Sequence, residues 1–291
     1  MSNSLAQTLT PTDPSIEDWR PARPKPTGGS RHVKSFLEDL RIDYGPMGLL
    51  GRFFLRADQA VRERGITLAF ADLPTVRAVN KQVQDPWWDL MPMFDCEAHS
   101  FSPNRSLALL GYNADGDVVA SQAARVYDLR ESNLHGAVAD LSLFYGSAER
   151  PAGATCQVTA AAGEQISGFV TYSGCGWYRP DYRGRLLSTI LPRISRALAL
   201  AMWNAQYTIS FIDWKLVRKG VSERYGYRNA DDGVHIDGMF DGDFYGALAW
   251  MPRERLLEDL QTYLGESLAQ IDRMVGGRGD EVRVAKGAGE R

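Results

Sequence analysis

The hydrophobic pattern of the chain predicts an alternation of amphipathic helices and short strands. Apolar residues recur every three or four positions in several segments, as on the buried face of a helix. These predicted helices lie at about 36–64 (interrupted at Gly45-Pro46 and ended by Gly65), 73–84, 183–204, 214–225 and 253–274. Short runs rich in β-branched and aromatic residues predict strands at 65–72, 107–112, 118–127, 166–177, 207–212, 234–236 and 244–250.

This order of elements predicts a mixed α/β (α+β) fold rather than a series of βαβ units. The Asp-Gly pair at 115–116 lies between two apolar runs and indicates an antiparallel hairpin. We therefore expect a mostly antiparallel central sheet flanked by helices. One domain is expected over 31–274, with an N-terminal helical extension, a long loop or insertion at 131–165 and a C-terminal helix. The proline-rich segment 1–30 and the polar segment 275–291 are expected to be disordered tails.

Composition excludes several classes of protein. The chain has 291 residues, of which 44% are hydrophobic, and a net charge of −3, so global disorder and a dedicated nucleic-acid binder are not expected. The three cysteines form no Cys-x-x-Cys pair and the four histidines show no ligand spacing, so no metal site is expected. No apolar run approaches the ~20 residues of a membrane span and no secretory signal is visible, so no membrane partner and a cytoplasmic location are expected.

The segment from Trp177 to Ser188 has the features of an anion site. A predicted strand ends at Pro180, and Gly184 lies where the next helix begins, so backbone N–H groups would point into the turn. Between residues 179 and 196 there are five arginines and one acid, a local charge of +4. Arginine suits phosphate because its planar fork donates two hydrogen bonds. The pattern favours a phosphate or pyrophosphate cradle, and the alternative is a helix start with solvated arginines.

Pro-Asp-Tyr-Arg-Gly-Arg at 180–185 resembles the acyl-CoA-binding motif of the GNAT (Gcn5-related N-acetyltransferase) superfamily. The segment 223–228, with its Gly-Tyr pair, resembles the second signature of that family, and the elements between the two have the order that the family requires. The resemblance implies a GNAT-like fold in which the strand before the motif splays from its neighbour. It also implies a CoA-binding site, whose residues would be Gly176, Trp177, Arg183, Gly184, Arg185, Leu186, Leu187 and Ser188.

The implied activity is transfer of an acetyl group from acetyl-CoA (or of another acyl group from its acyl-CoA) to an amine, by direct attack in a ternary complex. The acceptor would be a small-molecule or peptide amine, and no metal or nucleic acid is implied. Two alternatives remain open, namely a catalytically degenerate interaction module and a transferase that uses a carrier-bound acyl donor. The C-terminal helix could supply a homodimer surface.

The sequence departs from the family pattern at three positions. Leu186 and Ser188 stand where the family prefers glycine or alanine, although a Leu186 side chain that points into the core would leave its N–H available. Ser222 stands where many members have a tyrosine that protonates the leaving thiolate. Tyr225 is then the candidate acid, although its register is wrong, and Cys175 is a candidate nucleophile.

Other polar and aromatic groups have two interpretations each. Candidate general bases are Asp140, Glu164, His135 and Asp237, each of which could instead be a surface or structural group. The five aspartates between 229 and 245 could attract a cationic acceptor or could form Asp-Gly turns. The aromatic cluster of 86–94 could line an acceptor pocket or belong to the core.

Overall fold

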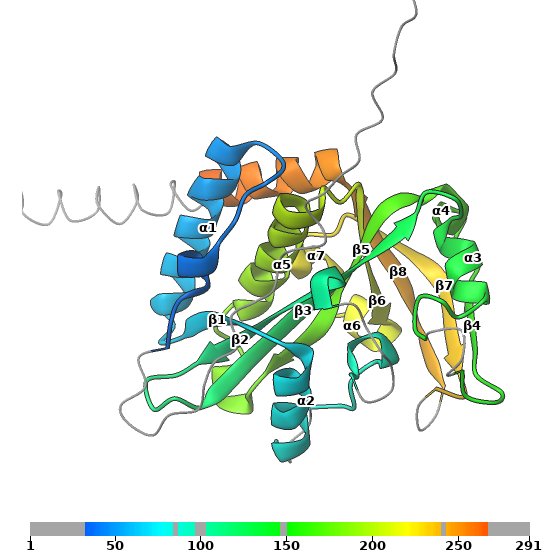
Figure 1. Ribbon diagram of the computed structural model, residues 1–291, viewed down its shortest axis with the longest axis horizontal. Helices are drawn as coiled ribbons and strands as arrows, with labels where there is room; N and C mark the ends of the chain where they lie inside the picture. Colours follow the sequence, from blue (N-terminus) through cyan, green and yellow to red (C-terminus); the bar gives the residue numbers. More distant parts are fainter. Residues whose placement is uncertain (1–32, 84–86, 97–102, 146–149, 240–242, 267–291) are drawn as a thin grey trace, which may run out of the picture.

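A computed structural model describes residues 33–83, 87–96, 103–145, 150–239 and 243–266. Within these ranges the chain forms one eight-stranded sheet in the order β1-β2-β3-β5-β6-β8-β7-β4 (Figure 1). The strands are β1 Thr67–Ala71, β2 Ser106–Tyr112, β3 Val118–Leu129, β4 Thr155–Val158, β5 Gly168–Tyr178, β6 Tyr207–Asp213, β7 Asn229–Asp237 and β8 Phe244–Pro252. All neighbouring strands are antiparallel except β5 and β6, so the expected mixed, mostly antiparallel sheet is confirmed.

Helices cover both faces of this sheet (Figure 1). They are α1 Met47–Arg62, α2 Leu73–Gln82, α3 Leu134–Ala139, α4 Ala162–Gln165, α5 Leu187–Trp203, α6 Trp214–Val217, α7 Val221–Tyr225 and a C-terminal helix over 253–266. One apolar cluster joins α1, α5 and the C-terminal helix to one face, and a second joins α2 and α3 to the other. From Ile190 to Trp203 every side chain of α5 is buried, because the sheet, α1 and the C-terminal helix surround it.

The N-terminal region confirms the predicted interruption at Gly45-Pro46. A short 3-10 helix, Phe36–Asp39, begins with a capping box in which Ser35 and Glu38 bond to each other's backbone. The chain then turns at Gly45, which has a φ of +82°, before α1 begins. Gly65, with a φ of +75°, follows the end of α1 and leads into β1, as predicted.

The segment 131–165, expected to be a long loop or insertion, contains regular structure. It forms α3, β4 and α4, and β4 pairs with β7 to extend the sheet by one strand. In β4, Cys156 and Val158 are buried and Thr155 and Gln157 are exposed. A four-residue strand shows only two repeats of this alternation, which is too short a pattern to stand out among small residues.

Three other predicted elements differ in extent. The helix expected from residue 183 begins at Leu187, because Gly184 and Leu186 take left-handed backbone conformations. The helix expected at 214–225 is two helices separated by Gly220, whose φ is +68°. The strand expected at 234–236 is the nine-residue β7, which is paired on both sides.

The C-terminal helix is confirmed up to residue 266, where the description ends. Its apolar stripe packs inward, with Leu256 and Leu260 buried and Leu257, Tyr263 and Leu264 packed against the same core. This stripe therefore packs against the core of the chain itself, and the homodimer surface expected on this helix stays a prediction. The two tails expected at 1–30 and 275–291 lie outside the described residues. Among the described helices, none is both long enough and apolar enough to cross a bilayer.

Candidate functional site

The strand β5 has one free edge over its second half. It pairs with β6 in parallel only from Val170 to Tyr172, opposite Tyr207 to Ile209. It then continues to Tyr178, paired in the described structure with β3 alone. The two central strands therefore separate after Tyr172, as the resemblance implied, and leave the backbone of β5 open toward the gap.

A bulge changes the direction of β5 within this open half. Ala123 of β3 lies opposite Gly174, and Ser121 lies opposite Trp177, so Cys175 and Gly176 together face a single residue of β3. Cys175 takes a left-handed φ of +57°. Bulges of this kind break the hydrogen-bond ladder and redirect backbone groups, so the bulge adds to the open backbone at this edge.

Gly174 and Gly176 differ in what a side chain at each position would contact. A Cβ on Gly174 would lie 2.9 Å from Cε1 of Tyr172 and 3.0 Å from Cε2 of Phe94, so aromatic packing excludes a side chain there. A Cβ on Gly176 would lie 3.3 Å from Oε1 of Gln122 and 3.9 Å from the Tyr225 hydroxyl, and the residue is exposed. Gly176 is therefore the position at which a ligand could approach the backbone.

The Cys175 thiol lacks the features of an activated nucleophile. Its hydrogen-bond contact within the described structure is the Ser121 hydroxyl, 3.7 Å away. Burial raises the pKa of the thiol to about 12. A protonated thiol is a weak nucleophile, so this environment favours direct transfer over a covalent acyl-enzyme.

We expect Cys175 to react slowly with iodoacetamide. At pH 8 a thiol with a pKa of about 12 is about 1,000-fold less ionised than one with the ordinary value of 9.0. Alkylation of the native protein, followed by peptide mass spectrometry, should therefore be about 1,000-fold slower at Cys175 than in the same protein unfolded in urea. Equal rates in the two states would restore the nucleophile hypothesis.

Tyr225 ends the short helix α7, and its hydroxyl lies beside Gly176 in the open half of β5. Gly226 closes that helix with a φ of +92°. Burial raises the pKa of the Tyr225 hydroxyl. Ser222, at the position where the family has its tyrosine, is buried and donates to the Glu223 carboxylate. In the described structure, the tyrosine hydroxyl beside this part of β5 therefore belongs to Tyr225, three positions after Ser222.

The sequence did not single out Tyr178, which adds a second hydroxyl to this region. The hydroxyl is buried and has no hydrogen-bond partner among the described residues. Burial raises the pKa of Tyr178 well above its ordinary value, and the nearby Tyr225 adds to the shift. A buried hydroxyl without a partner at the end of β5 marks a place where a polar ligand group would be stabilised.

The turn after β5 presents a row of backbone amides. After a 3-10 turn, Pro180–Tyr182, the chain passes through Gly184 at φ +76° and Leu186 at φ +59° before α5 begins. The amide groups of residues 184–188 have no hydrogen-bond acceptor in the part of the chain that the structure describes. Unpaired N–H groups at the start of a 17-residue helix can bind an anion, so this turn is a candidate anion site.

Leu186 keeps the backbone conformation that glycine would take. Its side chain is 58% exposed, whereas that of Leu187 is buried, so the expectation that Leu186 points into the core was wrong. The left-handed conformation costs an ordinary side chain about 1–2 kcal/mol. Leucine at this position therefore stores local strain, and the amide of Leu186 has no acceptor among the described residues.

This strain predicts an order of stability between two variants. Leu186→Gly should be more stable than Leu186→Ala by about 1 kcal/mol, because only glycine adopts a positive φ without a steric cost. Both variants remove the same exposed side chain, so each is the control for the other. Urea unfolding measures the difference, and an alanine variant as stable as the glycine variant would contradict the assigned conformation.

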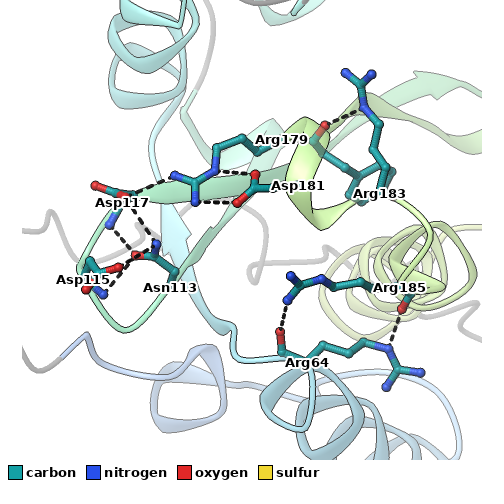
Figure 2. Close-up of polar contacts among 9 residues, drawn as sticks. Arg64, Asn113, Asp115, Asp117, Arg179, Asp181, Arg183 and Arg185 are labelled. Atoms are coloured by element: carbon teal, nitrogen blue, oxygen red, sulfur yellow. Dashed lines mark hydrogen bonds and ion pairs between the residues drawn. The ribbon is translucent and has the colours of Figure 1, made fainter.

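Arginines surround the turn, and they differ in whether a carboxylate neutralises them. Arg179 forms a two-pronged ion pair with Asp181 and a 3.1 Å contact with Asp117, so its charge is neutralised (Figure 2). Arg183 and Arg185 are exposed and have no carboxylate within ion-pair distance among the described residues. Their guanidinium groups donate to backbone carbonyls instead. Nε of Arg183 donates to the carbonyl of Tyr178 at 3.1 Å.

Arg64 joins this group from the turn that follows α1, 121 residues before Arg185 in the chain. It donates from Nε to the carbonyl of Arg185 at 2.5 Å, and Nη1 of Arg185 donates back to the carbonyl of Arg64 at 3.3 Å (Figure 2). These reciprocal bonds join the end of α1 to the turn before α5. No local sequence signal could have placed Arg64 there, because the contact depends on how α1 packs.

Arg193 and Arg196 do not belong to the candidate anion site, so the local charge of +4 counted from the sequence overstates the free positive charge there. Arg193 forms a bidentate ion pair with Asp259 of the C-terminal helix, and Arg196 is completely buried 3.8 Å from the same carboxylate. The positive charge that remains free at the turn comes from Arg183, Arg185 and Arg64.

The candidate general bases lie away from this edge. His135 and Glu164 face each other at 3.8 Å across α3 and α4, beside the edge strand β4. Asp237 ends β7, and the Asp140 carboxylate accepts from the Ser142 amide in the turn after α3. Strands β7 and β4 are three and four positions from β5, about 14–19 Å at the usual strand spacing.

Parts of the acidic and aromatic segments make contacts within the protein. Two of the five aspartates, Asp231 and Asp232, accept hydrogen bonds from the indoles of Trp250 and Trp214 at 2.7 and 2.6 Å. In the aromatic cluster Trp87 stacks on Trp177 at 4.7 Å, next to the open half of β5. Asp241 and Pro86 lie outside the described residues. Among the described residues, no group of His, Cys, Asp and Glu side chains could hold a metal ion.

No family model matches the chain, and no curated protein sequence matches it. Among solved structures, RimJ of Mycobacterium smegmatis in complex with CoA-disulfide is 10% identical, with a TM-score of 0.38 over 68% of this chain and 88% of RimJ. AAC(6')-Ib in complex with paromomycin and acetyl-CoA is 13% identical, with a TM-score of 0.38 over 66% of this chain and 95% of that chain. Spermidine N-acetyltransferase of Vibrio cholerae in complex with CoA and spermine is 9% identical, with a TM-score of 0.36 over 66% of this chain and 98% of that chain.

These TM-scores lie below 0.5, so the fold is assigned from the topology of the chain itself. The predicted order of elements is present, the single parallel strand pair separates after Tyr172, and a glycine-containing turn follows before α5. These features are those implied by the sequence resemblance. The chain therefore has the mixed, mostly antiparallel sheet flanked by helices and the order of elements that the resemblance to the Gcn5-related N-acetyltransferase superfamily implied.

Proposed function

We propose that the protein is a CoA-dependent N-acyltransferase that transfers an acetyl group from acetyl-CoA to an amine. The observation that carries the proposal is the continuity of two open backbone surfaces. The free edge of β5 beyond Tyr172 leads directly into the turn whose amides, at 184–188, have no acceptor among the described residues. A long ligand with a diphosphate at one end and an amide-containing arm matches both surfaces.

The residues that would hold the diphosphate of CoA are those of the turn. The backbone N–H groups of 184–188 would donate to it, and the exposed guanidinium groups of Arg183 and Arg185 would add positive charge. The pantetheine arm would lie along β5, where Gly176 has no side chain and Trp177 is covered by Trp87. When bound, acetyl-CoA supplies an activated acyl group as a thioester.

The chemistry required of the chain is positioning and one proton transfer. The neutral amine attacks the thioester carbonyl carbon, a C–N bond forms, the C–S bond breaks, and the departing thiolate takes a proton. Tyr225 is the proposed proton donor, because its hydroxyl lies beside Gly176 at the free edge and its raised pKa keeps it protonated. The amine loses its own proton to solvent, directly or through water.

Ligand-dependent melting of the wild-type protein tests the cofactor assignment. Saturating CoA or acetyl-CoA should raise the melting temperature by about 5 °C or more, because a ligand at 100 times its Kd stabilises the native state by about 2.7 kcal/mol. Inorganic pyrophosphate at the same concentration is the control and should give a smaller shift. No shift with either form of CoA, or an equal shift with pyrophosphate, would contradict a CoA site.

A further inference from the structure

The backbone at the end of α7 is held by two arginines from α5. Nη1 of Arg193 donates to the carbonyl of Arg224 at 2.9 Å, and Nη2 of Arg196 donates to the carbonyl of Tyr225. Arg193 is 9% exposed and Arg196 is fully buried. Two consecutive carbonyl groups are therefore fixed from the interior of the protein, at the residue that carries the proposed acid.

Asp259 of the C-terminal helix holds both arginines. Its carboxylate accepts from Nε and Nη2 of Arg193 at 2.8 and 2.9 Å, and Oδ2 lies 3.8 Å from Nη2 of Arg196. The Asp259 side chain is itself largely buried. The bidentate geometry fixes the orientation of the Arg193 guanidinium plane as well as its position. We call Arg193, Arg196 and Asp259 the clamp.

The clamp passes so close to Gly226 that a side chain would not fit there. A Cβ at this position would lie 2.6 Å from Oδ2 of Asp259 and 2.8 Å from Nη2 of Arg193, which no real contact allows. The same residue needs its φ of +92° to end α7. The glycine beside Tyr225 is thus required both by the turn and by the close approach of the clamp.

The clamp is a poor arrangement for stability alone. Two guanidinium groups share one carboxylate, and Nε and Nη1 of Arg196 have no hydrogen-bond partner among the described residues. Its guanidinium lies 4.6 Å over the Tyr227 ring, which offsets only part of the cost of burying a charge. Apolar residues at these positions would pack without the cost of burying charge. Stability alone therefore does not explain why this buried polar arrangement is present.

We propose that Asp259, acting through Arg193 and Arg196, is a positioning residue that holds Tyr225 against the free edge of β5. The C-terminal helix then takes part in the proposed reaction through the clamp. This inference rests on the proposed function, in which Tyr225 protonates the departing thiolate. It predicts that Asp259 affects the rate of that proton transfer and leaves the binding of CoA unchanged.

A double-mutant cycle between Asp259→Asn and Tyr225→Phe tests the inference. Turnover of acetyl-CoA is followed as thiol release, with the fastest acceptor among spermine, paromomycin and a lysine-containing peptide. Asp259→Asn should lower kcat about 10-fold and change KM for acetyl-CoA less than about 2-fold. In the Tyr225→Phe background, the same substitution should lower kcat less than about 2-fold, because the group that it positions is already gone.

Matched variants separate positioning from general destabilisation. Glu258→Gln changes the neighbouring, exposed carboxylate of the same helix and should leave kcat unchanged, whereas Asp259→Glu should restore most of the lost activity. Arg193→Lys keeps the charge but loses the bidentate pair, and it replaces Asp259→Asn in the cycle if that variant does not fold. If the wild type is active and the loss of kcat in the double variant equals the product of the two single losses, this inference is overturned and the proposed function is not. A folded wild type without transferase activity would instead overturn the proposed function, and this inference with it.

Discussion

Reversing the charge of both exposed arginines of the turn, in Arg183→Glu with Arg185→Glu, is expected to weaken CoA binding about 100-fold. Both guanidinium groups face solvent without a carboxylate partner in the described structure, so they are available to a diphosphate. The two substitutions replace attraction by repulsion at the amides of 184–188, and a 100-fold change corresponds to about 2.7 kcal/mol. Isothermal titration calorimetry at ~0.1 M salt measures the change.

The control reverses two arginines at the opposite end of the sheet. Arg130 follows β3 and Arg255 lies in the first turn of the C-terminal helix, and each forms an exposed ion pair. Arg130→Glu with Arg255→Glu changes the net charge equally, and it should alter the affinity for CoA less than about 2-fold because the charges are beyond the screening length. Equal losses in the two double variants would mean that only the overall charge of the protein matters.

Tyr225→Phe is expected to lower kcat about 100-fold while the affinity for CoA stays within about 2-fold. The variant keeps the aromatic ring and removes the hydroxyl beside Gly176, so it removes a proton donor without opening a cavity. The pH dependence of kcat gives a second test of this role. A general acid works while it is protonated, and burial raises the pKa of Tyr225, so the wild-type kcat should hold past pH 9 before it falls.

Tyr245→Phe is the matched control for this substitution. Tyr245 is an exposed tyrosine at the start of β8, with its hydroxyl bonded to Asp243 at 3.2 Å. Its loss should leave kcat unchanged. A Tyr225→Phe enzyme with full activity would remove the hydroxyl from the mechanism. Tyr178, whose buried hydroxyl has no partner in the described structure, would then be the next residue to test.

The local pattern of the sequence was sufficient for most elements and for the position of the turn that we propose as the site. The apolar period predicted α1, α2 and α5, and the Asp-Gly pair predicted the β2–β3 hairpin. The turn at 183–188 was found because strand, glycine and helix follow one another within a few residues. Such features are encoded by neighbours in the chain, which is why they are readable without a structure.

The remainder depends on contacts between distant segments. Arg193 and Arg196 belong by sequence to the basic run after β5, yet α5 turns them inward toward Asp259, more than 60 residues away. Arg64 approaches the turn from just after α1 for the same kind of reason. The sequence interpretation named Tyr225 as the candidate acid although its register differs from that of the family. Counting from Gly226 favours Ser222, whereas the short helix α7 presents Tyr225 to β5.

The most direct test of the central claim is mass spectrometry of the products formed from acetyl-CoA by the purified wild-type protein. Spermine, paromomycin and a lysine-containing peptide serve as amine probes, with the Tyr225→Phe protein as the control. The proposed function predicts an N-acetylated amine and an equal amount of free CoA, with little of either from the control. Tight binding of CoA without acetylation of any of these amines would contradict it and would favour an interaction module built on the same fold.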